Sequence, residues 1–108
     1  MSTINRVNGG VATAVSGAAT LNNRFGKVTS EALSTAAGAL YTLTITNSQI
    51  AATDMVMASV GYGSSTTGTP NVARVEPAAG SLVIVIQNIH GSAALNGTIN
   101  VAYASFPK

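Results

Sequence analysis

The sequence predicts an all-β protein: an antiparallel two-sheet sandwich, jelly-roll-like or closed into a small barrel, with an extended N-terminal arm. The chain of 108 residues is 46% hydrophobic but only 7% charged, a composition that favours one packed domain over disorder. Residues 40–46 alternate strictly between apolar residues and threonine, as expected for a strand with one buried face. From residue 25 onward, short segments rich in β-branched and aromatic residues are separated by turn residues, and none has a helical pattern.

Residues 1–24 differ from the rest of the chain, because they hold few large apolar residues apart from Ile4 and Leu21. We expect this segment to form an arm that is ordered mainly by contacts made elsewhere, preceding a sandwich domain of residues 25–108. A short helix over residues 11–21 is the alternative, although the threonine, valine, serine and glycine within it disfavour a helix.

The first strand of the domain is predicted over residues 25–33, and a turn over residues 34–39 separates it from the strand of residues 40–46. In that second strand the period of two places three apolar side chains on the core face: Tyr41, Leu43 and Ile45. The three threonines that alternate with them suit the solvent-facing side of a pleated sheet.

Four further strands are predicted over residues 54–62, 72–76, 82–86 and 98–106. The continuous apolar run of residues 82–86 is typical of a strand that is buried on both faces. The loop that follows the strand of residues 54–62 is rich in glycine, serine and threonine, and Pro77 ends the strand of residues 72–76. The dipeptide Asn96-Gly97 predicts a hairpin turn before the last strand.

Residues able to carry out catalysis are few, so we expect no enzymatic activity, no catalytic residues, no cofactor and no metal site. The chain lacks cysteine, and its one histidine, His90, falls in a predicted loop where a solvent-facing or interface role is expected. The three carboxylates, Glu31, Asp54 and Glu76, lie on different predicted elements, as isolated or ion-paired charges do. Three tyrosines fall on predicted strands, where packing in a core or interface is expected rather than stacking on a sugar or base: Tyr41, Tyr62 and Tyr103.

The low charge indicates a surface made for contact with other proteins, because a free soluble domain normally carries mixed surface charge. No stretch interleaves basic and aromatic residues, and no apolar run reaches 18 residues, so neither a nucleic acid nor a membrane is an expected partner. Arg6, Arg24 and Lys27 precede the first acidic residue, and we predict that these three residues contact an acidic partner surface.

Three segments resemble the small capsid decoration (cement) proteins of tailed bacteriophages: residues 40–47, the hydroxyl-rich loop after Gly63, and residues 82–86 followed by Asn96-Gly97-Thr98. The resemblance covers residues 25–108 and lies in their general sequence character, without a diagnostic motif. It implies a non-enzymatic virion protein on the outer capsid surface, where it bridges neighbouring major capsid protein subunits and associates with itself as a dimer or trimer. No functional residue of that group carries over, because no motif positions match.

The alternative is a receptor- or glycan-binding module of a phage tail fibre or an adhesin. Such a module would present exposed tyrosines in a groove and would use the loop of residues 61–71 for recognition.

Overall fold

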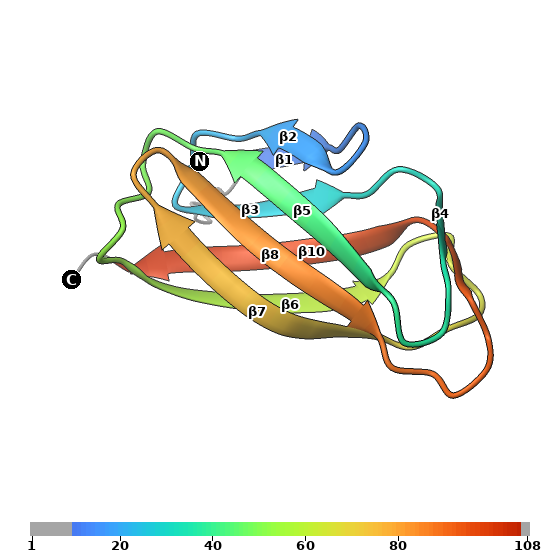
Figure 1. Cartoon of the computed structure of the whole chain (residues 1–108). Coiled ribbons are helices and arrows are strands. Elements are labelled where there is room, and N and C mark those ends of the chain that lie inside the picture. Colours follow the sequence, from blue (N-terminus) through green and yellow to red (C-terminus); the bar gives the residue numbers. More distant parts are fainter. Residues whose placement is uncertain (1–9, 107–108) are drawn as a thin grey trace, which may run out of the picture.

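The computed structural model describes residues 10–106 and shows an all-β protein built from two four-stranded sheets and one two-stranded sheet (Figure 1). Sheet A has the order β1-β3-β10-β6 and contains β1 (Gly10–Thr13), β3 (Phe25–Thr29), β10 (Ile99–Phe106) and β6 (Met55–Tyr62). Sheet B has the order β2-β5-β8-β7 and contains β2 (Ala18–Thr20), β5 (Leu40–Thr46), β8 (Ser81–Asn88) and β7 (Pro70–Ala78). The short pair of β4 (Leu33–Thr35) and β9 (Leu95–Gly97) lies at one end of the molecule.

The two large sheets lie face to face and enclose one apolar core, to which strands of both sheets contribute (Figure 1). In β5 the predicted alternation is confirmed: Tyr41, Leu43 and Ile45 are buried, and the intervening threonines are exposed. From sheet A, Val28, Val101 and Tyr103 face the same core. Full burial of each such aliphatic side chain contributes about 1.5–3 kcal/mol relative to its exposure, so this core is the main source of stability.

Strand β8 occupies an inner position in sheet B, between β5 and β7. Its residues Leu82, Ile84 and Ile86 are fully buried in the core. Val85 points to the other side of the sheet, where its cross-strand neighbours Thr42 and Arg74 flank it, and it is also buried. The prediction that this apolar run is covered on both faces is therefore confirmed at Val85.

The predicted antiparallel arrangement holds for five strand pairs and is wrong for two, because β1 pairs parallel with β3 and β2 pairs parallel with β5. A tight turn at Ser16 and Gly17, whose φ angles are 51° and 78°, separates β1 from β2 and lets them join different sheets. The small barrel is also wrong, since within residues 10–106 each large sheet has an edge strand at both ends and does not close on itself.

The extended arm expected over residues 1–24 is not confirmed. Its residues 1–9 lie outside the described part of the chain, and residues 10–24 include β1 and β2, with Ala14 and Leu21 buried in the core. The alternative helix over residues 11–21 is wrong for the same reason. An edge strand needs few large side chains because its backbone hydrogen bonds attach it to a sheet that already has a core.

Three local predictions are corrected. The strand expected over residues 25–33 ends at Thr29, where the Ser30 hydroxyl accepts a hydrogen bond from the Ile99 amide and the chain turns toward β4. Strand β7 continues through Pro77 and starts at Pro70, which an edge strand tolerates because its outer amide positions need no partner. The dipeptide Asn96-Gly97 forms no hairpin turn and belongs instead to β9, which pairs with β4.

Candidate functional site

The outer face of sheet A is the candidate site, because large apolar side chains gather there in contact with solvent. We call this surface the apolar face and define it by Phe25, Met55, Met57, Ala102, Ala104 and Phe106. Its four large residues are substantially exposed: Met55 by 67%, Met57 by 64%, Phe106 by 44% and Phe25 by 37%. Scattered exposed hydrophobic residues are ordinary, whereas a contiguous group of this kind marks a contact surface.

The strand register brings these residues together from distant parts of the sequence. Ala104 of β10 lies between Phe25 of β3 and Met57 of β6, and in the adjacent pair Phe106 lies opposite Met55. All of them point away from the core because residues two apart along a strand share a face, and the alternate residues Val56, Ala58, Val101 and Tyr103 point inward.

Two of these residues form an aromatic pair at one end of the face. The rings of Phe25 and Phe106 meet edge to face, with their centroids 6.3 Å apart and their planes at 75°. This arrangement is the favoured one for aromatic rings, so it holds both side chains in defined positions. The apolar face is therefore partly pre-ordered.

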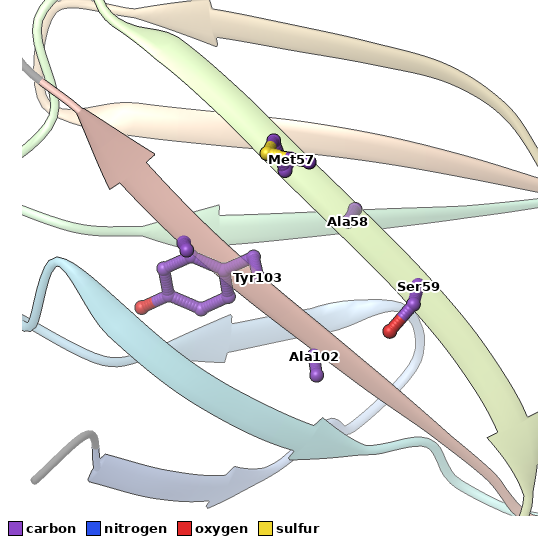
Figure 2. A pocket seen from close by; sticks show the side chains of 6 residues that line it. Met57, Ala58, Ser59, Ala102 and Tyr103 are labelled. Atoms are coloured by element: carbon purple, nitrogen blue, oxygen red, sulfur yellow. The ribbon is translucent and has the colours of Figure 1, made fainter. Parts of the chain in front are cut away.

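A shallow hollow of about 350 Å³ lies on the apolar face over β6 and β10. Figure 2 shows Met57, Ala58 and Ser59 on β6 and Ala102 and Tyr103 on the neighbouring β10. Ala104 of β10 also lines the hollow. The hollow exists because alanines occupy the outer positions of β10 where larger residues stand on the strands at both sides. Its lining is almost entirely apolar, so it suits an apolar side chain better than a polar ligand.

The outer face of sheet B has the opposite character. Its outward β5 positions are Leu40 and three threonines, and an exposed ion pair joins Arg74 and Glu76 of β7 at 3.1 Å. Val83 and Val85 of β8 face the same side. On the four strands of sheet A, by contrast, Lys27 is the single outward-facing charged residue, and it lies opposite Ala102. The outer face of sheet B is thus the more polar of the two broad surfaces, and the large exposed apolar side chains of sheet A gather at one end of its outer face.

The three predicted partner-contact residues have different positions. Lys27 is exposed at the border of the apolar face. The Arg24 side chain is 39% exposed, and its Nη1 lies 3.7 Å from the Oδ2 of the buried Asp54. Arg6 lies outside the described residues. Lys27 and part of the Arg24 side chain are therefore accessible at the surface, and the predicted contact of these residues stays a prediction.

The remaining charged and polar groups serve the fold. Asp54 Oδ2 accepts hydrogen bonds from the Ala51 amide and the Ser105 hydroxyl. His90 is exposed, as predicted, and its Nδ1 accepts hydrogen bonds from the amides of Ser92 and Ala93, which fixes a turn.

Within residues 10–106, no three histidine, cysteine, aspartate or glutamate side chains lie close enough to hold a metal ion. No helix in that range is long and apolar enough to span a bilayer.

Two of the three tyrosines belong to the core, as predicted. The Tyr41 hydroxyl donates to the Glu31 carboxylate at 2.9 Å, and the Tyr103 hydroxyl donates to the Asn23 carbonyl at 2.8 Å. Burial raises the pKa of both phenols, and the adjacent Glu31 carboxylate raises the pKa of Tyr41 further. Tyr62 is half-exposed, and its hydroxyl bonds to the Gly68 carbonyl.

These raised pKa values predict a loss of stability in alkali. Above about pH 10 the tyrosines of the unfolded chain release protons that the folded chain retains, so the free energy of unfolding falls as pH rises. Urea denaturation from pH 7 to pH 11 should show a plateau followed by a steep decline. Tyr41→Phe should reduce that decline, and an equally steep decline in this variant would contradict the assignment to Tyr41.

The apolar face is the feature that sequence reasoning missed. One pattern pointed to it: in residues 54–62 both alternating sets are partly apolar, with Met55 and Met57 on the side opposite Val56 and Ala58. Comparison of the chain with protein-family models, curated proteins and solved structures finds no match.

Proposed function

We propose that the protein is a non-enzymatic structural protein of a phage virion, which decorates the outer capsid surface and stabilises the shell by bridging neighbouring major capsid protein subunits. The observation that carries this proposal is the difference between the two broad surfaces: one carries a cluster of exposed methionines and phenylalanines with a single charge, and the other is more polar, with three threonines and an ion pair. A subunit of a layered assembly needs such a contrast, because one side is covered by protein and the other faces water.

The mechanism under this proposal is mechanical. Packaged DNA presses outward on a capsid, and each attached subunit adds contact area across a joint between capsid subunits. Individual contacts of modest size suffice, because many copies act together. Lys27, exposed at the border of the apolar face, is suited to meet an acidic capsid surface, and Arg6 belongs to the same proposed contact.

A jelly-roll topology is part of the proposal. The pairs β3–β10 and β5–β8 are nested in the sequence, and each pair lies in a different sheet. Strands β6 and β7, which follow one another inside both nested pairs, likewise lie in different sheets. This nesting is what folding one long hairpin over itself produces, and it supports a reduced jelly roll with β1 and β2 added at the edges.

The alternative, a receptor- or glycan-binding module, has less support. It calls for exposed tyrosines in a groove, and Tyr41 and Tyr103 are buried with their hydroxyls bonded internally. Tyr62 alone remains half-exposed among the tyrosines. Saturable binding on a glycan array would revive this alternative.

The proposed function predicts that the protein travels with large particles. Native source material would be sedimented, with peptide mass spectrometry across the gradient. We expect the chain at a fixed, high copy ratio to a shell protein, and its recovery only among small soluble species would contradict the proposal.

Reattachment to stripped particles would then test the basic contact. Lys27→Glu should weaken attachment at least about tenfold, because it places a carboxylate against an acidic surface. Arg74→Glu on sheet B makes the same charge change far from the apolar face and serves as the matched control. Equal attachment of the two variants would remove Lys27 from the contact.

A further inference from the structure

We propose that a second copy of this chain covers the apolar face, in a twofold symmetric dimer in which Met57 of each copy enters the hollow over Ala102 and Ala104 of the other. The proposal rests on the proposed function in taking this face to be buried in an assembly. It adds which protein covers the face and which side chain anchors the contact.

The charges of the face favour a second copy over a charged partner. Lys27 is the single charge on the outer side of the four strands of sheet A; it lies opposite Ala102 and two strands away from the methionines of β6. A strongly charged partner would have to desolvate its own groups against Phe25, Met55 and Met57 without compensation. Another face with a single charge among apolar side chains largely avoids this cost, and the chain itself provides one.

The shape of the face is self-complementary. In a twofold interface, if residue i of one copy contacts residue j of the other, residue j also contacts residue i, so knob and hole must lie on the same surface. Met57 is a knob, since it is flexible and 64% exposed, and the hollow beside it is lined by alanines of the adjacent strand. Methionine is well suited to fill an irregular apolar hollow.

The rows of side chains suit the packing of two sheets. Met55 and Met57 form a ridge on β6, Phe25 stands on β3, and the alanines of β10 leave a valley between them. Sheets that pack face to face lie about 10 Å apart with interdigitating side chains. The β6 ridge of one copy can therefore lie in the β10 valley of the other, and the symmetry operation repeats this contact.

The available area indicates a weak dimer in free solution. The four strands of sheet A contain 4, 5, 8 and 8 residues, and at about 3.4 Å along a strand and 4.8 Å between strands they present roughly 400 Å² on each copy. The total of roughly 800 Å² lies below the range of stable specific interfaces and within that of weak, transient ones. We therefore expect a dissociation constant in the micromolar range or weaker, with fuller association where copies are concentrated on a particle.

Sedimentation equilibrium of the purified full chain over a wide concentration range tests the dimer. The average mass should rise from one copy toward two, and Met57→Lys should raise the dissociation constant at least about tenfold by placing a charge in the hollow. Thr44→Lys introduces a lysine on the outer face of sheet B instead and should leave the dissociation constant unchanged. Circular dichroism would verify that both variants are folded.

Cysteine cross-linking tests the geometry directly, because the chain has no cysteine of its own. A mixture of Met57→Cys and Ala102→Cys copies should form a mixed disulfide under mild oxidation, whereas Thr44→Cys copies should not cross-link to either. A mass of one copy at every concentration, a trimer, or an unchanged dimer in Met57→Lys would overturn the proposal.

The outcomes separate this inference from the proposed function. A dimer of the pure chain that does not sediment with particles would leave the interface in place and contradict capsid decoration. The opposite outcome is a chain that sediments with particles but is a monomer when pure and forms no Met57–Ala102 cross-link on the particles. That result would assign the apolar face to the capsid protein and overturn the dimer.

Discussion

Replacement of Asn88 by alanine is expected to lower the free energy of unfolding by about 3–5 kcal/mol, a large part of the roughly 5–15 kcal/mol typical of a domain. The Asn88 side chain is fully buried at the end of β8 and uses all four of its hydrogen-bonding positions. Its Nδ2 donates to the Thr35 and Ala93 carbonyls at 3.1 Å and 2.9 Å, and its Oδ1 accepts the Thr69 and His90 amides at 3.0 Å and 3.1 Å.

These four bonds explain the size of the expected effect. They join three chain segments, at residues 35, 69 and 90–93, to one end of the sandwich. Alanine would leave four backbone groups without a partner, and each buried unpaired group costs about 1–3 kcal/mol before water reaches it. The sum is smaller than four full penalties because loops at the end of a sandwich can partly rehydrate.

Urea denaturation would measure the effect of Asn88→Ala, with two comparison variants. Asn88→Asp keeps the shape and the acceptor but loses both donors, so it should also destabilise strongly. Asn96→Ala removes an exposed asparagine whose Oδ1 accepts the Thr66 and Thr67 amides, and water can replace those bonds. A loss of less than about 1 kcal/mol for Asn88→Ala would contradict the role assigned to this residue.

Replacement of Gly68 by alanine is expected to lower the free energy of unfolding by about 3 kcal/mol, for two separable reasons. Gly68 has a φ angle of 88°, a left-handed backbone conformation that costs a residue with a Cβ atom about 1–2 kcal/mol. A Cβ atom at this position would also lie 2.6 Å from the Cα of Leu95 in β9. Backbone atoms cannot yield as a flexible side chain does, so the loop or β9 must move.

Gly80→Ala is the matched control for Gly68→Ala. Gly80 has a φ angle of 81° in the turn between β7 and β8, and an added Cβ atom there would meet nothing within 4 Å. It should therefore show only the conformational cost, and the difference between the two variants measures the clash with Leu95. Equal losses of stability in urea would show that the loop moves freely and that its contact with β9 does not contribute to stability.

The strands of the inner part of the sandwich were predictable from the sequence because their signals are local. Strand β5 has the predicted bounds of Leu40–Thr46, and its core-facing and solvent-facing residues are as expected. The apolar run within β8 and the inward set of β10 were likewise readable, since a period of two depends only on neighbours along the chain. Low charge and the absence of cysteine also came directly from composition.

Pairing between distant segments decided the rest. Residues 10–24 joined the edges of both sheets because unpaired strand edges were available to them, which no local pattern in this small-residue segment indicates. Arg24 lies beside Asp54, which is 30 residues later in the chain. The Asn96-Gly97 dipeptide pairs with β4 as part of β9 and does not form a hairpin turn.

The apolar face shows most clearly which features follow from the sequence alone and which depend on the tertiary structure. The sequence determined that Phe25, Met57 and Ala104 point outward from their own strands, because alternation sets the face of each residue. Only the tertiary structure decided that β3, β10 and β6 lie side by side, which aligns these residues in one row and leaves the alanine-lined hollow between larger side chains. The physical reason is that strand order is set by long-range backbone pairing and core packing, whereas the direction of a side chain is set by its own strand.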